Sequence, residues 1–387
     1  MTLPPRQSPY AERWLLIALI GLAQLRQARA EDAISYKYQD YRESAGRIAV
    51  QVHSAMVEKE FGPALQLRLT GVIDAIAGAT PTGQPAPTPD GQVPLSHLEE
   101  KRKAWSLDFT RQFTGFRLTA GAANSRESDY VSNGWSLNAQ AELNAKNTTV
   151  LLGVAGMDDE IKVFFQQPPA TKHTVEVIAG VNQLLDPRTA VTFNLTCSRS
   201  TGFLSDPYKL VQKRVEVFPG VFLLRTFGEN RPDSRTKWIA LAALNRAYSQ
   251  VNGAIDVSYR FHRDDHGLSS HTVNLEWYQK IGAKFILRPG LRYFSQEAAD
   301  YYLISLTGTP ITPTARPSGK APYYSADYRL SALRSLNYGL KAVWTLNDAW
   351  QIDAALERYE MHSRDTITAA SAYPRADIIT AGIRFAF

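Results

Sequence analysis

Two histidines and two aspartates crowd one short stretch of the chain. His262, Asp264, Asp265 and His266 fall close together, and His271 follows. Imidazole nitrogens and carboxylate oxygens bind divalent metals, so this stretch is a candidate metal site. It contains no His-Glu-x-x-His pair and no cysteine, and a glycine ends it. A polar turn between two strands is therefore the favoured interpretation, and we expect neither a metal nor a cofactor.

A larger set of charged residues occupies alternate positions of the strands expected below. Its basic members are Arg68, Arg117, Arg260, Lys280, Arg288, Arg292, Lys341 and Arg384, and its acidic members are Asp74, Asp108, Glu142, Glu176, Asp256, Glu276, Asp353 and Glu357. The basic residues at 260, 280, 288 and 292 lie on three consecutive expected strands and could form a positive ladder opposite Asp353 and Glu357. A selective pore needs an excess of one sign at its constriction. Because the two signs nearly balance, we favour salt bridges that hold a wall, with an anion path as the alternative.

The elements that carry these residues are expected to be β-strands. From residue 31 onward, apolar and polar side chains alternate over segments bounded by turn-like residues. The expected strands lie near 34–42, 47–59, 64–77, 102–113, 115–125, 130–144, 147–157, 171–184, 188–199, 235–248, 250–262, 269–281, 284–297, 324–346, 349–362 and 376–387. Short connections follow the even-numbered strands and long connections follow the odd-numbered ones. This alternation of short and long connections predicts a transmembrane antiparallel β-barrel of about 16 strands with long outer loops. The alternation holds only if 324–346 is one strand.

The two faces of the expected strands differ in chemistry. Within 130–144, Trp135 and Leu137 point to one side and Asn138 and Glu142 to the other. A soluble β-sandwich also alternates, but aromatic residues near strand ends favour membrane girdles. The mean hydropathy of −0.26 agrees with a barrel, because lumen-facing polar residues lower the average.

The N-terminus resembles an export signal. Arg6 and Arg13 are basic, the stretch from Trp14 to Leu25 is apolar, and Ala28-Arg29-Ala30 has the form of a cleavage site. We expect a cleaved signal peptide at 1–30 and an outer-membrane β-barrel at 31–387.

The C-terminus resembles an insertion signal. The last strand ends Gly382-Ile383-Arg384-Phe385-Ala386-Phe387, with aromatic residues at the last and third-last positions. We expect the barrel-assembly machinery to bind the chain through Phe387.

Composition argues against other classes of function. Residues 1–30 contain four arginines and one glutamate, so their removal lowers the formal charge from +6 to +3 and gives no case for nucleic-acid binding. The lone Cys197 excludes an internal disulfide and Cys-based zinc, iron–sulfur and haem sites. No Ser-His-Asp spacing or nucleophile elbow appears, so we expect no enzyme. A hydrolase whose residues meet only in space is the least favoured alternative.

Several segments resemble the bacterial domain-of-unknown-function family 3570. They are Ile34–Tyr38, Ile73–Pro81, Ser128–Tyr130, Lys146–Thr149, Gly202–Lys209, Asp264–Gly267, Ser270–Thr272 and Ser325–Ser331. The resemblance implies an outer-membrane barrel in a Gram-negative bacterium and carries no activity with it. Members of that family are associated with extracytoplasmic redox proteins, including flavin-attachment enzymes.

Three functions remain open for such a barrel in outer-membrane lipid. A pore or transport channel is favoured, since a barrel of about sixteen strands encloses an aqueous lumen. A closed docking barrel that serves a flavin-linked redox assembly is the second hypothesis, and a hydrolase is the third. The long loop 200–234 contains an apolar stretch at 215–224 that we expect either to fold inward as a plug or to bind a partner.

Overall fold

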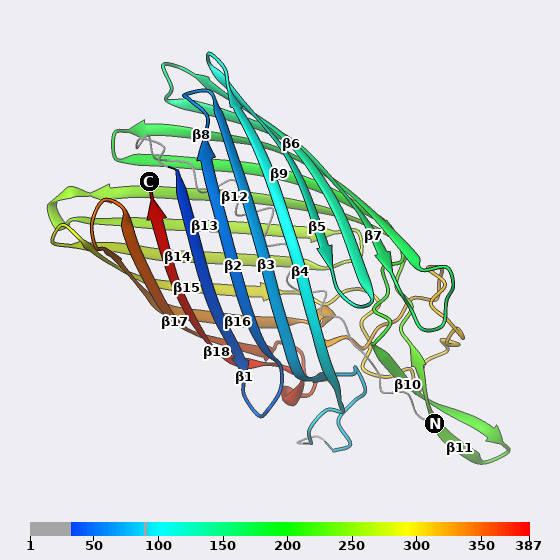
Figure 1. Cartoon of the computed structure of the whole chain (residues 1–387). Coiled ribbons are helices and arrows are strands. Elements are labelled where there is room, and N and C mark those ends of the chain that lie inside the picture. Colours follow the sequence, from blue (N-terminus) through cyan, green and yellow to red (C-terminus); the bar gives the residue numbers. More distant parts are fainter. Residues whose placement is uncertain (1–31, 89–90) are drawn as a thin grey trace.

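Sixteen antiparallel strands close into one β-barrel in the computed structural model, which describes residues 32–88 and 91–387 (Figure 1). The expected signal peptide, residues 1–30, lies outside the described residues. The barrel strands are β1 (Ala33–Glu43), β2 (Ala49–Glu60), β3 (Leu65–Pro81), β4 (Leu95–Gln112), β5 (Phe116–Arg126), β6 (Tyr130–Leu143), β7 (Thr148–Ile161), β8 (Ala170–Asp186), β9 (Thr189–Gly202), β12 (Ser234–Tyr248), β13 (Gly253–Asp264), β14 (Ser269–Ile281), β15 (Phe285–Gln296), β16 (Leu333–Thr345), β17 (Trp350–Ser363) and β18 (Arg375–Ala386). The predicted fold class is thus confirmed.

The first and last strands close the barrel. β1 pairs with β18 from Ala33 opposite Ala386 to Glu43 opposite Ala376, so no strand edge is left open. Closure satisfies the backbone N–H and C=O groups that lipid could not hydrogen-bond.

All sixteen predicted strands exist, but two of them begin elsewhere than predicted. The strand expected over 102–113 is β4 and already begins at Leu95. The strand expected over 324–346 is β16 and begins only at Leu333. Residues 324–332 belong to the preceding loop, which contains the 3-10 helix η2 (Tyr328–Leu330). Tyr324, Ala326 and Leu330 are buried there, so their alternation reflects loop packing and not a strand.

Pro289 lies inside β15, where a proline commonly marks a bend or a bulge. The register between β14 and β15 is the same on both sides of it, with Glu276 opposite Gly290 and Gln279 opposite Leu287. Proline removes one ladder donor here without inserting a residue.

Apolar side chains cover the outside of the barrel. The strand residues with large exposed apolar side chains include Leu69, Trp105, Trp135, Phe193, Trp238, Leu275, Trp344 and Ile379. The ladder registers put all of them on one face. In a barrel in lipid this is the expected outer face, and the opposite parity lines the lumen.

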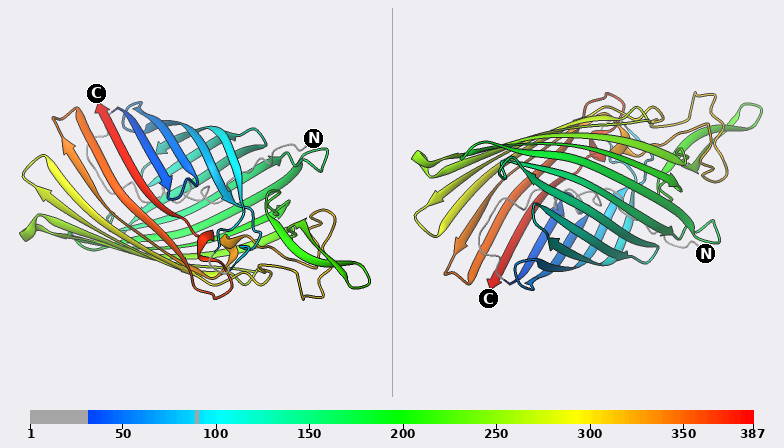
Figure 2. Two further views of the ribbon diagram at one scale, coloured as in Figure 1. Left: turned by 90° about the horizontal axis from the view of Figure 1, so that it is seen from below. Right: turned by 90° about the horizontal axis from the view of Figure 1, so that it is seen from above.

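The barrel has two unlike ends. Short turns close one end, where β1 begins and β18 ends, and we call it the turn end. Long connections gather at the other end, the loop end, as Figure 2 shows from two further directions. The buried apolar clusters consist mainly of loop-end residues, such as Val211, Leu306 and Tyr324. The loops at the loop end therefore pack into a buried core of their own.

Among the described residues, no helix is long and apolar enough to cross a membrane.

Candidate functional site

The predicted lumen residues share one face of the sheet. Arg288 on β15 stands directly opposite Lys341 on β16, and Arg292 stands opposite Asn337. Arg260 on β13 faces the same way. It pairs with Thr272, which pairs with Phe294, and Phe294 lies two residues from Arg292 on β15. Lys280 and Arg384 have this parity too but lie nearer the turn end.

The acids predicted to lie opposite the positive ladder instead share its wall. Asp353 and Glu357 are on β17, two strands from β15, so the predicted opposition across the lumen is wrong. Lys341 Nζ lies 3.1 Å from Asp353 Oδ2, and Arg288 Nη1 lies 3.6 Å from Glu276 Oε2. These cross-strand ion pairs neutralise part of the ladder.

Two guanidinium groups of the ladder keep their charge uncompensated. Among residues 32–88 and 91–387, neither Arg260 nor Arg292 has a carboxylate within ion-pair distance. Arg260 interacts electrostatically with Arg292, and Arg292 interacts electrostatically with Tyr359. Arg292 borders a cavity of about 200 Å³ together with Arg288, Lys341 and Glu276. Because Arg288 and Lys341 are paired and Glu357 also lines the cavity, Arg292 and the neighbouring Arg260 are the cations of the ladder that no carboxylate pairs among the described residues.

The side chains of the five residues in the candidate metal site do not converge on one point, because they contact different partners. Asp264 bonds Arg235 and accepts hydrogen bonds from the backbone N–H groups of His266 and Leu268, at 3.0 and 2.9 Å. The His266 ring lies 2.8 Å from the carbonyl oxygen of Ser234 and 3.1 Å from Tyr301 Oη. These contacts make Asp264 and His266 part of a capped polar turn.

The other three members point elsewhere. His271 lies on the outer face with its Nδ1 2.7 Å from Tyr259 Oη, His262 lies on the inner face, and Asp265 Oδ1 accepts the backbone N–H of Thr236 at 2.9 Å. Within the described part of the chain, no group of three His, Cys, Asp or Glu side chains is placed to hold a metal.

Two long loops meet across the loop end. We call their packed segments, residues 203–210, 229–233 and 298–332, the loop bridge. Leu210 N donates to the carbonyl oxygen of Thr82 at 2.8 Å, although Thr82 follows β3, six strands from β9 around the barrel. Tyr208 Oη also bonds the carboxylate of Asp129, between β5 and β6. The loop bridge thus spans the mouth of the barrel.

Glycine lets the chain leave the wall for the loop bridge. Gly202 ends β9 with φ +106°, and a Cβ there would lie 2.3 Å from the carbonyl oxygen of Thr171. Only glycine fits this backbone and this close approach. Downstream, Asp206 Oδ1 accepts the N–H of Tyr208 at 3.0 Å and turns the chain across the mouth.

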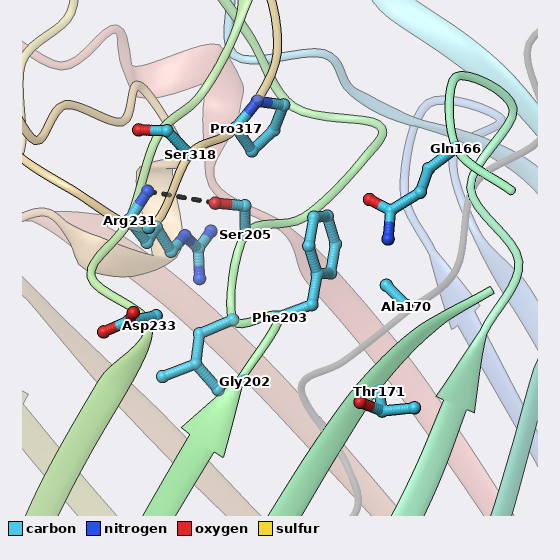
Figure 3. A pocket seen from close by; sticks show the side chains of 12 residues that line it. Gln166, Ala170, Thr171, Gly202, Phe203, Ser205, Arg231, Asp233, Pro317 and Ser318 are labelled. Atoms are coloured by element: carbon cyan, nitrogen blue, oxygen red, sulfur yellow. Dashed lines mark hydrogen bonds between the residues drawn. The ribbon is translucent and has the colours of Figure 1, made fainter. Parts of the chain in front are cut away.

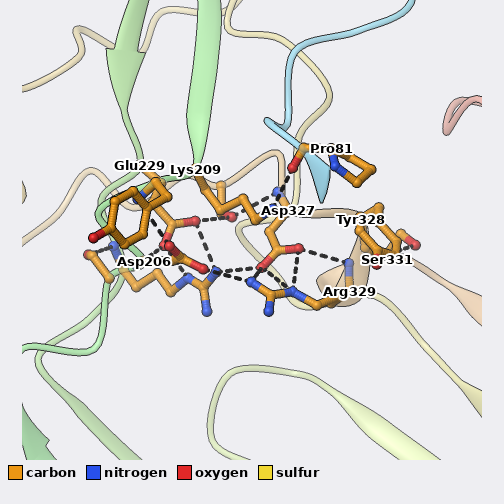
Figure 4. A network of polar contacts seen from close by, with 12 residues as sticks. Pro81, Asp206, Lys209, Glu229, Asp327, Tyr328, Arg329 and Ser331 are labelled. Carbon is orange, nitrogen blue, oxygen red and sulfur yellow. Dashed lines mark hydrogen bonds and ion pairs between the residues drawn. The ribbon is translucent and has the colours of Figure 1, made fainter. Parts of the chain in front are cut away.

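Six charged side chains hold the loop bridge together (Figure 4). They are Asp206, Lys209, Glu229, Arg231, Asp327 and Arg329. Arg329 Nη2 lies 2.8 Å from Asp206 Oδ2 and also bonds Asp327. Arg231 Nη2 donates to Asp327 Oδ2 at 2.9 Å and to Glu229 Oε2 at 3.0 Å. Continuous ion pairs therefore join the segments before β10, after β11 and before β16.

Burial sets the protonation of this network. Burial, with Asp206 and Asp327 nearby, raises the pKa of Glu229 to about 7 even though Arg231 opposes the shift. Although burial opposes it, the positive charge of Arg329 and Lys209 holds the pKa of Asp327 well below its usual range. Burial lowers the pKa of Lys209, which donates to the carbonyl oxygen of Pro81. At neutral pH, Glu229 is the titrating member.

A cavity of about 270 Å³ opens beside the loop bridge (Figure 3). Phe203, Ser205, Arg231 and Asp233 line it from one side and Gln166 from the other, and Ser205 Oγ accepts the N–H of Arg231 at 3.0 Å. Because Arg231 is already paired with two carboxylates, this cavity offers no free cation.

The apolar stretch 215–224 does not plug the lumen. It belongs to a two-stranded hairpin, β10 (Leu210–Phe218) and β11 (Val221–Gly228), which pairs with no barrel strand and extends away from the loop end (Figure 1). Phe218 is 70% exposed and Leu224 is 61% exposed. The inward-folding alternative is wrong, and an exposed apolar hairpin remains.

Sequence reasoning missed both the hairpin and the ion-pair network. The hairpin had a local signal, because Pro219-Gly220 is a turn dipeptide between two runs of β-branched and aromatic residues. The network had a weaker one: the segments 202–209 and 325–331, which carry the family resemblance, supply four of its six charges.

Comparisons with known proteins agree on the family and the fold. The model of a family described as "Protein of unknown function (DUF3570)" matches residues 17–171 and 164–380. Comparison with curated protein sequences finds no match. Among solved structures, a bacterial polysaccharide outer membrane secretin aligns with a TM-score of 0.50 and 9% identity, covering 93% of this chain and 99% of that one.

Two further solved structures have lower TM-scores. The siderophore receptor PirA from Pseudomonas aeruginosa aligns with a TM-score of 0.44 and 10% identity over 92% of this chain, which spans only 62% of the receptor. The CymD monoaromatic hydrocarbon channel aligns with a TM-score of 0.42 and 8% identity, covering 93% of this chain and 90% of that one. Together with the closed sixteen-strand barrel, the alignment with the polysaccharide secretin shows the fold of outer-membrane β-barrels.

Proposed function

This chain belongs to the family of proteins of unknown function DUF3570, and from that premise we propose that it is an outer-membrane channel whose lumen favours small anions. One observation carries the proposal: Arg260 and Arg292 face the lumen without a carboxylate within ion-pair distance among the described residues. Unpaired cations on a lumen wall attract anions and repel cations. The paired residues Lys341 and Asp353 beside them hold the wall.

The barrel itself supports a channel. Sixteen strands enclose more space than their own inward side chains fill. The apolar outer face and the polar inner face differ as in water-filled barrels. The loop bridge narrows the entrance at the loop end, which makes this channel one for small solutes.

Solute uptake by proteoliposomes tests the proposal. Liposomes that contain the purified barrel should swell faster in a small carboxylate solute than in an amine of equal size. In Arg260→Gln with Arg292→Gln that preference should disappear while the total swelling rate persists. The matched control is Lys280→Gln, which removes one lumen-facing cation outside the cavity that Arg292 lines. This variant should keep the preference for the carboxylate solute. Equal swelling by liposomes with and without protein would contradict the channel.

The hairpin formed by β10 and β11 favours a second candidate function, docking of a partner. Its tip exposes Phe218, Phe222 and Leu224, and large apolar groups exposed to water mark interaction sites. The hairpin is at the loop end, which faces out of the cell if the long loops do. In that orientation the partner would lie outside the cell, and we expect the hairpin not to serve a periplasmic redox assembly.

Cross-linking on intact cells tests docking. A photoreactive residue in place of Phe218 should give one discrete protein adduct, which Phe222→Ser with Leu224→Ser should remove. Adducts to lipid alone would contradict a protein partner.

A further inference from the structure

Three cations stand together on the outer face of the barrel. Lys101 and Lys103 lie on β4, and Arg126 on β5 is directly opposite Lys103 in the ladder. All three side chains are exposed, and within the described residues none of them has a carboxylate within ion-pair distance. Like charges directly opposite each other destabilise a sheet. An external anion would offset that cost.

The cluster sits where the outer face changes from charged to apolar. Trp105 follows Lys103 by two residues toward the turn end and is 47% exposed, and Leu107 and Phe109 continue the exposed apolar band. Exposed tryptophans mark the membrane–water interface in outer-membrane barrels. Lys101, Lys103 and Arg126 are therefore at the level of lipid headgroups, on the loop-end side.

Two other cations at this level of the outer face have partners in the protein, whereas Arg199, Arg263 and Arg334 stand singly on separate strands within the described residues. Arg42 Nη2 lies 2.8 Å from Asp40 Oδ2, and Arg358 Nη1 lies 2.8 Å from Asp377 Oδ1. The same-face acid on β4, Glu99, lies beyond Lys101 on the side away from Trp105. The cluster differs from these pairs by pointing three positive charges at the lipid.

We propose that Lys101, Lys103 and Arg126 bind the phosphate groups of lipopolysaccharide in the outer leaflet, with Trp105 packed at the boundary between its sugars and acyl chains. The long loops place this end of the barrel outward, where the outer leaflet supplies such lipid. Three adjacent cations match a headgroup that carries more than one phosphate, whereas a phospholipid with one phosphate satisfies fewer of them. Arginine and lysine both form charge-assisted hydrogen bonds to phosphate.

Lipid titration of the purified full-length barrel in detergent tests this site. Bis-phosphorylated lipid A should bind and raise the unfolding temperature, and lipid A stripped of its phosphates should bind on the order of 100-fold more weakly, at about fivefold for each cation. Lys101→Glu, Lys103→Glu and Arg126→Glu combined should abolish the difference between the two lipids. If that variant fails to fold, Lys103→Gln with Arg126→Gln should reduce the difference by about 25-fold.

The control variant is Arg199→Glu, Arg263→Glu and Arg334→Glu combined, which changes the charge of the outer face equally but on three separate strands. It should keep tight binding of the phosphorylated lipid. Equal loss in both triple variants would overturn the site in favour of a general charge effect. Equally tight binding of phosphatidylglycerol would overturn lipopolysaccharide as the ligand.

Discussion

Each charged residue of the loop bridge is held by partners that are distant in sequence. Asp327 is 1% exposed and forms ion pairs with Arg231 and Arg329. Asp206, in the other long loop, also forms an ion pair with Arg329. A buried ion pair adds little when compared with a well-packed apolar pair, but loss of one partner leaves a buried charge alone. Asp327→Ala should therefore weaken the loop bridge by about 3–5 kcal/mol.

Glu229 makes the stability of the loop bridge depend on pH. Its folded pKa of about 7 lies above the value of 4.5 for an unperturbed glutamate, so the folded state holds the proton more tightly. Its contribution is largest below pH 4.5 and is lost as the pH rises to 7. Hydrogen-exchange protection of residues 318–331, corrected for intrinsic rates, should fall over this range in the wild type.

Glu229→Gln should flatten that dependence, because glutamine cannot ionise. Glu297→Gln, an acid whose partner Arg364 is also at the loop end, should leave it unchanged. A dependence of equal slope in the Glu229→Gln variant would show that another group causes it.

Among the elements, the barrel strands were predictable and the loop structure was not. Period-2 alternation depends on local neighbours, so β6 and β13 could be placed with their faces from sequence. Residues 324–332 alternate in the same way, but the ion pairs of Asp327 and Arg329 hold them in a loop. Those pairs join positions about a hundred residues apart, which no local pattern reveals.

The candidate site followed the same division. Parity placed Arg288 and Lys341 on one face, since alternation alone decides it. That Asp353 pairs with Lys341, on a neighbouring strand, depends on register. Turn lengths constrain register only loosely, so Arg260 and Arg292 could not be distinguished from their paired neighbours in advance.

The hairpin β10–β11 should contribute nothing to conduction, because it extends away from the loop end. Replacing residues 215–223 by an Asn-Gly turn keeps the contacts of Gln212 with Ser305 and Leu306 and suits a two-residue hairpin loop. Single-channel conductance of this variant in planar bilayers should equal that of the wild type. A clear rise would mean that the hairpin obstructs the lumen.

At the scale of the whole molecule, the C-terminus completes the closing strand pair. Phe387 N donates to the carbonyl oxygen of Asp32 at 2.9 Å, its ring stacks on Phe385 at 5.7 Å, and Lys59 Nζ lies 5.6 Å from its centroid. Deletion of Phe387 should impair assembly, seen as less heat-modifiable barrel in outer-membrane fractions. Cys197→Ala, on an outer-face position of β9, should assemble normally. Normal assembly of the Phe387 deletion would contradict a role for the terminal aromatic residue.

The orientation of the whole barrel is also testable. Protease added to intact cells should cut the loops at 82–94, 203–233 and 297–332 and spare the turns at 144–147 and 346–349, because long loops face outward. Cleavage confined to the turns would reverse the barrel in the membrane.

The reversal potential in a potassium chloride gradient tests the central claim most directly. A single wild-type barrel in a planar bilayer should pass current with chloride preferred over potassium, because Arg260 and Arg292 leave positive charge on the lumen wall. Arg260→Glu with Arg292→Glu should lower the ratio of chloride to potassium permeability by about fivefold or more, since one unit charge at 4 Å in water is worth about 1 kcal/mol. Absence of current in the wild type, or an unchanged reversal potential in the double variant, would contradict the account.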